Sequence, residues 1–136
     1  MPITKQSKQV LWAGAASASV SAGAATNSDP LAIGQDAIGA IVQIKAVHSG
    51  TPAAGDTVDI FALYTAGDPD ADPDVADEYD TALHGEHIAR LDLASDSPAI
   101  TTAALDHLAK GVTLRAVNNG AAAVTVYAQV HEQNFA

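Results

Sequence analysis

The chain has 136 residues, no cysteine and a formal net charge of −10 at pH 7, from six basic and sixteen acidic side chains. This length suits one domain with a buried core. The lack of cysteine excludes disulfides, zinc–thiolate sites and thiol nucleophiles, and the negative charge argues against nucleic acid or an anionic membrane as a partner. Small side chains such as alanine bury little area each, so we expect contacts between copies to add to stability.

The first nine residues carry two lysines, Lys5 and Lys8, and no acidic side chain. We expect residues 1–9 to form an arm that extends from a domain over residues 10–136 and contacts another subunit or a larger assembly, where these lysines would meet carboxylates. The apolar run over residues 10–13 resembles the core of a secretion signal. It is too short, and the glycine and serines that follow dilute it, so we do not assign a signal.

The first half of the chain contains four segments that predict strands. One is expected near residues 8–12. The Ala/Ser-rich residues 16–28 are typical of either a linker or a strand and turn of small residues, and we favour the strand. Residues 38–48 and 56–64 alternate apolar and polar side chains with the period of two that a half-buried strand shows.

Two large apolar side chains, Phe61 and Leu63, lie on the face of residues 56–64 that the alternation leaves outside the core. We therefore expect this end of the strand to be covered on both sides. At least one of the two side chains is expected to lose exposure when neighbouring copies or the last strand are added. Other apolar residues on outward faces that suggest contact between copies are Ile41, Val47 and Val117.

The second half of the chain begins with an acidic stretch, Asp68 to Asp80, which holds seven of the sixteen acidic residues. Asp80 and Thr81 are expected to cap a short helical turn over residues 82–84. A strand over residues 87–93 and a short strand near Ile100 should follow.

The C-terminal residues 112–116 and 124–130 both alternate, and Asn118-Asn119-Gly120 lies between them. A two-residue loop would pair Leu114 with Thr125 and put the two apolar faces on opposite sides. A three-residue loop pairs Leu114 with Val126 and puts both faces on one side. Because burial of one face fixes the register, we predict a hairpin with the three-residue loop and a positive φ at or beside Gly120.

Short strands at regular spacing, separated by Gly- and Pro-containing turns, are typical of a sandwich or a jelly roll. The sequence therefore predicts an all-β fold. It is expected to be a single-domain β-sandwich or jelly roll of seven to eight strands with an extended N-terminal arm.

The acidic stretch is the first candidate for ion binding. Asp68, Asp70 and Asp72 match positions one, three and five of an EF-hand loop. Pro73 stands where the turning glycine belongs, and Tyr79 stands where the bidentate glutamate belongs, so the EF-hand interpretation fails. We expect an exposed loop that is solvated or docks on basic residues of a neighbour, with irregular calcium ligation left open.

Other catalytic and metal patterns fail on spacing. The two histidines of His84-Gly85-Glu86-His87 share a face only on a helix, which Gly85 interrupts. The sequence contains no Gly-x-Ser-x-Gly elbow, phosphate loop or dinucleotide fingerprint. We expect no catalytic residue, no cofactor and no metal. A carbohydrate-binding sandwich stays open as a rival, with Trp12, Tyr64, Tyr79 and Tyr127 as its candidate aromatics.

The middle and end of the chain resemble a class of tailed-phage virion proteins. The residues that carry the resemblance are Ala62-Leu63-Tyr64 leading to Gly67-Asp68-Pro69-Asp70, then Tyr79-Asp80-Thr81, then Leu105 to Val117 with Asn118-Asn119 after it. Members of this class are small, cysteine-free β-sandwiches rich in Ala, Gly, Ser and Thr. They serve as head decoration, cement or fibre-base proteins.

This resemblance implies a non-enzymatic virion protein, assembled in the host cytoplasm and bound to the outside of a phage head. Its partners would be the major capsid protein and copies of itself, with a trimer as the first expectation, and neither nucleic acid nor a membrane. The arm of residues 1–9 would then contact another subunit or the capsid. A tail or neck component and a carbohydrate-binding or adhesin module are the alternatives. The residues expected to make interactions are Lys5, Lys8, Trp12, Phe61, Leu63, Asp70 and Asp72.

Overall fold

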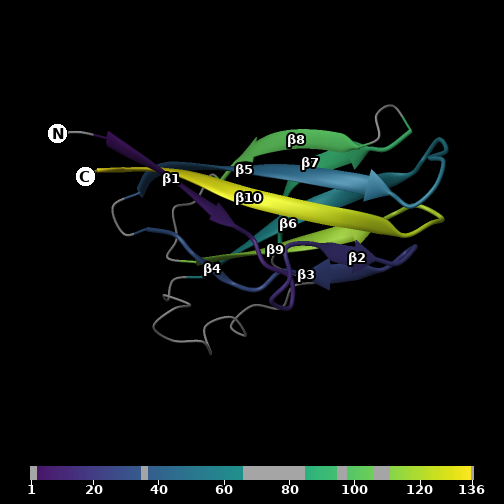
Figure 1. The fold of residues 1–136 in the computed structure, drawn as a ribbon, viewed down its shortest axis with the longest axis horizontal. Coiled ribbons are helices and arrows are strands. Elements are labelled where there is room, and N and C mark those ends of the chain that lie inside the picture. The colour runs from purple at the N-terminus through teal and green to yellow at the C-terminus, as the bar shows by residue number, and fades with distance from the viewer. Residues whose placement is uncertain (1–2, 35–36, 66–84, 95–97, 106–110, 136) are drawn as a thin grey trace.

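The computed structural model of the chain describes residues 3–34, 37–65, 85–94, 98–105 and 111–135 (Figure 1). These residues form ten strands. The strands are β1 Ile3–Gln9, β2 Ala18–Val20, β3 Ala25–Asn27, β4 Leu31–Ala32, β5 Ala37–His48, β6 Thr57–Thr65, β7 Glu86–Asp92, β8 Ala99–Ala104, β9 Gly111–Asn118 and β10 Val124–Phe135.

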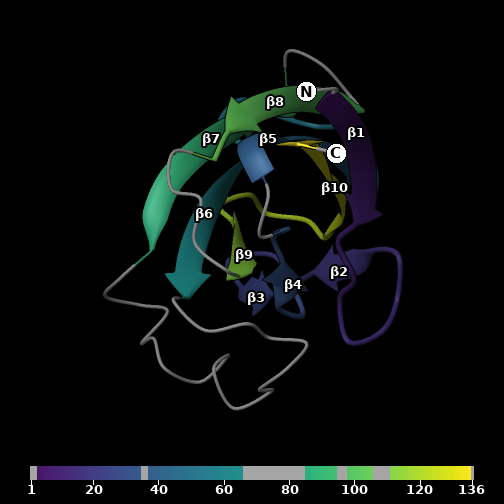
Figure 2. The same cartoon turned by 90° about the vertical axis from the view of Figure 1, so that its left-hand side faces the viewer.

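The strands form two antiparallel five-stranded sheets that pack as a β-sandwich (Figures 1 and 2). The front sheet has the order β1–β10–β5–β8, and β2 also pairs with β10. The back sheet has the order β3–β9–β6–β7, and β4 also pairs with β9. The predicted all-β sandwich is confirmed, although the described residues form ten strands rather than seven or eight.

The centre of the front sheet is the pair β5 and β10, each twelve residues long. Alternation fixes their register, since a slip by one residue would turn every apolar side chain to solvent. Val42, Ile44 and Ala46 of β5 are fully buried, as the sequence predicts, whereas Ile38 at the start of the strand is 41% exposed. The core that the two sheets enclose is built mainly from β-branched and small side chains.

The predicted hairpin between the last two strands is wrong. β9 belongs to the back sheet, where Leu114 pairs with Ala62, and β10 belongs to the front sheet, where Val126 pairs with Ala46. Leu114 and Val126 are both buried, but they face the same core from opposite sheets. The alternation identified the buried side chains correctly and could not identify the partner strands.

The segment between β9 and β10 crosses from one sheet to the other, and side-chain hydrogen bonds hold this crossing. The Asn118 amide donates to the carbonyls of Val20 at 3.0 Å and Ala122 at 2.8 Å. Gly120 is not among the described residues with positive φ, contrary to the prediction. A Cβ at Gly120 would lie 2.7 Å from Oδ1 of Asp56, so a larger residue there would force the Asp56 side chain to move.

The expected N-terminal arm is also wrong. Residues 3–9 pair with β10 along their whole length, from Ile3 opposite Phe135 to Gln9 opposite Gln129. Segment 3–9 is therefore the edge strand of the front sheet, and the two chain ends lie together at one end of it (Figure 1). Main-chain pairing orders this segment within the single chain, so its order does not by itself imply a partner.

The strand expected near residues 8–12 lies earlier in the chain, as β1, which ends at Gln9. The other predicted strands are confirmed. Residues 16–28 contain the short strands β2 and β3, and β5, β6, β7 and β8 lie where alternation placed strands. The expectation that the end of β6 is covered on both sides also holds for Leu63, which is only 2% exposed. The predicted helical turn over residues 82–84 and the acidic stretch lie outside the described residues. No helix in the described part of the chain is long and apolar enough to span a bilayer.

Candidate functional site

The outward side of the front sheet is the candidate functional surface, and strand alternation determines which side chains it presents. Register places Ser7, His131, Ile41 and Ala104 in one row across the four strands. The next row is Gln9, Gln129, Gln43 and Thr102. We call this surface the acid-free face, and its residues are Ile3, Lys5, Ser7, Gln9, Gly39, Ile41, Gln43, Lys45, Val47, Ile100, Thr102, Ala104, Thr125, Tyr127, Gln129, His131 and Gln133.

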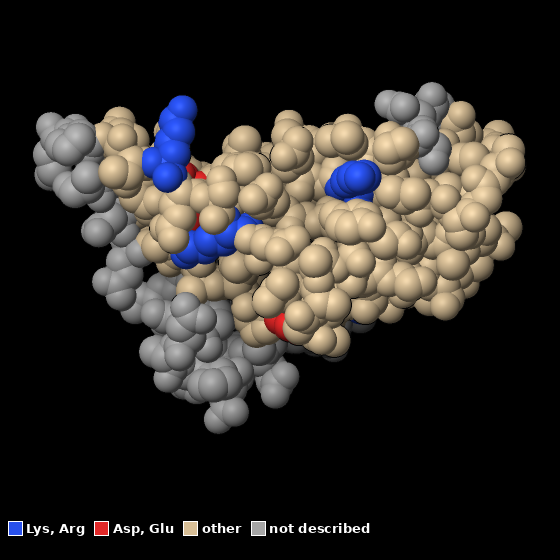
Figure 3. Space-filling view, in the orientation of Figure 1, with Lys and Arg blue, Asp and Glu red and all other residues tan. Residues whose placement is uncertain are grey.

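This face differs in charge from the rest of the chain. It contains Lys5, Lys45 and His131 and no Asp or Glu, although the whole chain carries sixteen acidic residues. Figure 3 shows this side of the molecule as a largely uncharged surface with blue lysine patches and very little red. A partner bound here meets positive charge in spite of the net charge of −10.

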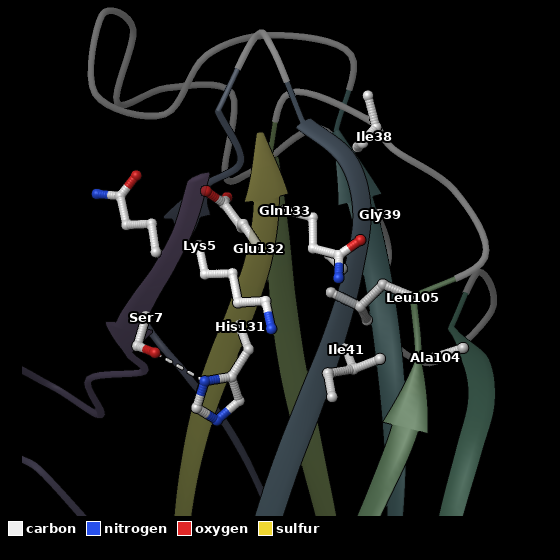
Figure 4. Close-up of a pocket in the computed structure, with 12 residues that line it drawn as sticks. Lys5, Ser7, Ile38, Gly39, Ile41, Ala104, Leu105, His131, Glu132 and Gln133 are labelled. Atoms are coloured by element: carbon white, nitrogen blue, oxygen red, sulfur yellow. Dashed lines mark hydrogen bonds between the residues drawn. The ribbon is translucent and has the colours of Figure 1, made fainter. Parts of the chain in front are cut away.

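An open pocket of about 670 Å³ lies at the end of this face near the chain termini, and we call it the end pocket. Figure 4 shows Lys5 and Ser7 from β1 and His131 from β10 beside Ile41 from β5. Ser7 Oγ and His131 Nδ1 are joined by a 2.7 Å hydrogen bond. Ile38 and Ile41 line the pocket while 41% and 45% exposed, so it offers aliphatic surface next to a cationic side chain.

A second pocket, of about 390 Å³, lies further along the same face. Three glutamines from adjacent strands line it, and we call Gln9, Gln129 and Gln43 the glutamine row. Tyr127, 38% exposed, and Ile100, 58% exposed, complete its wall. The Lys45 ammonium lies 5.2 Å from the centroid of the Tyr127 ring, within the range of a cation–π contact.

A buried carboxylate, Glu132, lies on the core side of β10. Its Oε1 accepts a 2.9 Å hydrogen bond from the Gly34 amide and lies 3.3 Å from Lys8 Nζ. Lys8 also donates to the Ala32 carbonyl at 2.8 Å. Because burial of a charge is costly unless the charge is paired, this group fastens β1 and the segment before β5 to β10.

A polar cluster on the outward side of the back sheet is centred on Asp59. Arg90 donates two hydrogen bonds to its carboxylate, at 2.8 and 2.9 Å, and His87 Nε2 lies 2.8 Å from Oδ1. Asn119 donates to Oδ2 at 2.7 Å. Chiefly because of the hydrogen bonds from Arg90, the pKa of the Asp59 carboxyl lies well below its usual range. The cluster ties β6, β7 and the crossing segment together.

The structure places the predicted interaction residues in different environments. Lys5 is exposed beside the end pocket. Lys8 points the other way and pairs with Glu132 of its own chain. Trp12 is 4% exposed and belongs to the core, so it is not available to a partner.

The two apolar candidates on β6 also differ. Leu63 is buried within the single chain, so a neighbouring copy cannot cover it further. Phe61 is half-buried, with its ring edge-on to His87 at 5.3 Å between centroids. Asp70 and Asp72 lie outside the described residues, and the expectation of a loop without a dedicated ion site stays a prediction.

Sequence reasoning missed the residues that the front sheet brings together. Glu132 had a signal, because it continues the alternation of Val126, Ala128 and Val130 at a position that should be apolar. The glutamine row had none, since its members are more than thirty residues apart in the chain and meet only through the strand order.

Comparison with known proteins shows the fold alone. No protein family and no curated protein matches the sequence. Latent PorU from Porphyromonas gingivalis is 12% identical with a TM-score of 0.50, over 97% of this chain and 13% of that one. The chain therefore shares the β-sandwich architecture of a module that is a small part of PorU.

Two further solved structures are similar over nearly the whole chain. A capsid chain of Helicobacter pylori bacteriophage KHP30 is 20% identical, with a TM-score of 0.43 over 95% of this chain and 93% of that one. The C-terminal CBM6 of the laminarinase LamC from Zobellia galactanivorans is 7% identical, with a TM-score of 0.46 over 96% and 99%. β-Sandwiches with different roles thus resemble this chain, and its function has to be argued from its own residues.

Proposed function

We propose that this chain is a non-enzymatic structural protein of a tailed-phage virion, a decoration or cement protein on the outer surface of the head. It binds the major capsid protein and other copies of itself in a symmetric homo-oligomer, for which a trimer is the first expectation. The residue pattern of the middle and end of the chain, which resembles that class, supports this proposal together with the surface of the front sheet.

The observation that carries the proposal is the exposed aliphatic surface around the end pocket. Ile38 and Ile41 line the pocket at 41% and 45% exposure, and Ile3, 55% exposed, stands two residues from Lys5 on β1. Exposed aliphatic side chains gathered around a concavity are typical of a surface that another protein covers. In a small chain rich in alanine, a partner that covers these isoleucines adds buried apolar surface that the core alone does not supply.

The fold suits an assembly role. The twelve-residue strands β5 and β10 pair over most of their length, and β1 continues the same sheet, so the end pocket stands on paired strands rather than on a loop. A surface held by paired strands keeps its shape when the partner arrives and loses little conformational entropy on binding. Lys5 beside the aliphatic surface favours a partner surface that carries a carboxylate.

Sedimentation of the purified chain, alone and with shells of the major capsid protein from the same genome, tests this proposal. We expect a discrete oligomer and binding to the shells. Ile38→Asp with Ile41→Asp should abolish both, since a charge cannot be covered by an apolar partner surface. Ile100→Asp, at an exposed isoleucine of the same face outside the end pocket, is the matched control and should retain both.

A chain that stays monomeric at about 1 mM and does not bind the shells would overturn the proposal. So would oligomers and shell binding that survive the double substitution unchanged. Circular dichroism of each variant confirms that the substitutions, which lie on exposed positions, leave the fold intact.

A further inference from the structure

We propose that the glutamine row is a saccharide-binding site that takes an acidic oligosaccharide lying across the strands of the front sheet. This activity goes beyond the structural role and does not depend on it, because the row lies in a pocket separate from the end pocket.

The first argument is the geometry of the row. Gln9 pairs with Gln129, and Gln129 pairs with Gln43, so three amides stand side by side on adjacent strands, with Thr102 opposite Gln43 on the fourth. Strands are about 4.8 Å apart, so the row presents amides at that interval over about 10 Å, and over about 14 Å with Thr102. A saccharide chain presents hydroxyl groups in a comparable linear repeat.

The second argument is that the row is free to bind. Gln9, Gln43 and Gln129 are exposed, and their amides form no hydrogen bond with any described part of the chain. Each amide offers donors and an acceptor that can engage two neighbouring hydroxyls at once. A single exposed glutamine is ordinary solvated surface, whereas three in register that line one pocket supply convergent polar groups.

The third argument is the apolar wall of the same pocket. Tyr127 and Ile100 flank the amides, and a sugar ring has an apolar face that such side chains cover. Lys45 Nζ lies 5.2 Å from the centroid of the Tyr127 ring, so a cation and an aromatic ring stand side by side in the wall of the pocket. A single exposed tyrosine suits one extended chain rather than a flat crystalline surface, which calls for several aromatic rings in one plane.

Charge selects the class of saccharide. Lys45 is in the pocket, and no Asp or Glu lies on the acid-free face to repel a carboxylate. Acidic sugars are therefore favoured over neutral ones. A nucleic acid is a poor alternative because the whole chain carries −10, and a peptide strand needs a free sheet edge, whereas Gln43 and Gln129 lie on central strands.

Titration calorimetry of the full chain with oligogalacturonate and with a neutral xylo-oligosaccharide of equal length tests the inference. We expect millimolar or tighter binding of the acidic chain, and weaker binding of the neutral one. Gln43→Ala with Gln129→Ala should weaken binding at least about tenfold, and Lys45→Gln should remove the preference for the acidic chain. Gln133→Ala is the matched control, an exposed glutamine of the same strand as Gln129 that lines the end pocket and does not line the pocket of the glutamine row.

No binding of either saccharide at about 10 mM would overturn the inference, as would binding that the double substitution leaves unchanged. Tighter binding of the neutral chain would overturn the assignment of an acidic ligand. These outcomes are distinct from those of the assembly test, because Ile38→Asp with Ile41→Asp should disperse the oligomer without changing the affinity for the saccharide.

Discussion

At the scale of single residues, the two lysines of β1 have opposite roles. Lys8 lies 3.3 Å from a carboxylate whose side chain is 0% exposed, whereas Lys5 points to solvent on the acid-free face. Lysine on an edge strand also discourages unwanted pairing with another strand, so Lys5 protects the edge as well as offering charge. Of the two positive charges near the N-terminus, one is therefore neutralised within the chain, by Glu132, and only Lys5 is available to a partner.

Substitution of the two lysines separates these roles. Lys8→Ala should lower the free energy of unfolding by about 3 kcal/mol, because it leaves Glu132 buried without its counter-charge. Lys5→Ala should change it by less than about 0.5 kcal/mol, as is usual for an exposed side chain. Urea unfolding at pH 7 measures both. An equal decrease in the free energy of unfolding for the two variants would show that the Lys8–Glu132 pair does not fasten β1.

Asp59 predicts the pH dependence of stability. Because the Arg90 guanidinium holds the pKa of this buried carboxyl below its usual range, the folded state keeps it ionised after the unfolded state has taken up a proton. The contribution of Asp59 to the free energy of unfolding is therefore present above about pH 4 and is lost as the pH falls below that value. Asp59→Asn should flatten the decline in unfolding free energy between about pH 4 and pH 2.

Thermal unfolding across this pH range measures the effect. Arg90→Gln removes the main cause of the low pKa of Asp59 and should flatten the decline in the same direction. A decline in Asp59→Asn as steep as in the unchanged protein would assign the acid sensitivity to other carboxylates.

At the scale of strands, burial was predictable from the sequence and pairing was not. The alternation in β5, β6, β9 and β10 selects most of the buried side chains correctly, because it depends only on which face of each strand is covered; Ile38, which is exposed, and Leu63, which is buried on the outward face, are the exceptions. The partner of each strand depends on contacts far apart in the chain. Leu114 and Val126 were placed in one hairpin because they alternate in phase on either side of a Gly turn, a pattern that two strands facing each other across a core satisfy equally well.

The same limit explains what could be predicted of the candidate sites. Lys5 and the outward Ile41 were identifiable from charge and from alternation alone. The end pocket and the glutamine row required the order β1–β10–β5–β8, which brings the first residues of the chain beside the last. No local signal in the sequence near Gln9 indicates that Gln129 will be its neighbour.

The pairing of β1 with β10 predicts the effect of deleting residues 1–9. The deletion removes seven paired residues and exposes the edge of β10, and it also takes Lys8 from Glu132. We expect the shortened protein to unfold at a markedly lower urea concentration than the full chain, and to aggregate through the uncovered edge. Urea unfolding measures the loss of stability, and light scattering measures the aggregation. A shortened chain of unchanged stability would show that residues 3–9 are dispensable to the sandwich.

At the scale of the whole molecule, the two faces of the sandwich carry different chemistry. The acid-free face offers exposed isoleucines, lysines and free amides. The back sheet presents an Asp59 carboxylate already satisfied by Arg90 and His87. Such asymmetry suits a protein that binds its assembly partner through one surface. The part of the front sheet beyond the end pocket then stays available to a ligand.

The location of the chain on virions tests the central claim most directly. Virions made by the genome that encodes it, purified and imaged by electron cryomicroscopy, should carry the chain in symmetric copies on the outer surface of the head, with Ile38 and Ile41 against the capsid protein or a neighbouring copy. Copies confined to the tail or neck would contradict the placement on the head and support the alternative structural role. Complete absence of the chain from purified particles would contradict the structural assignment itself.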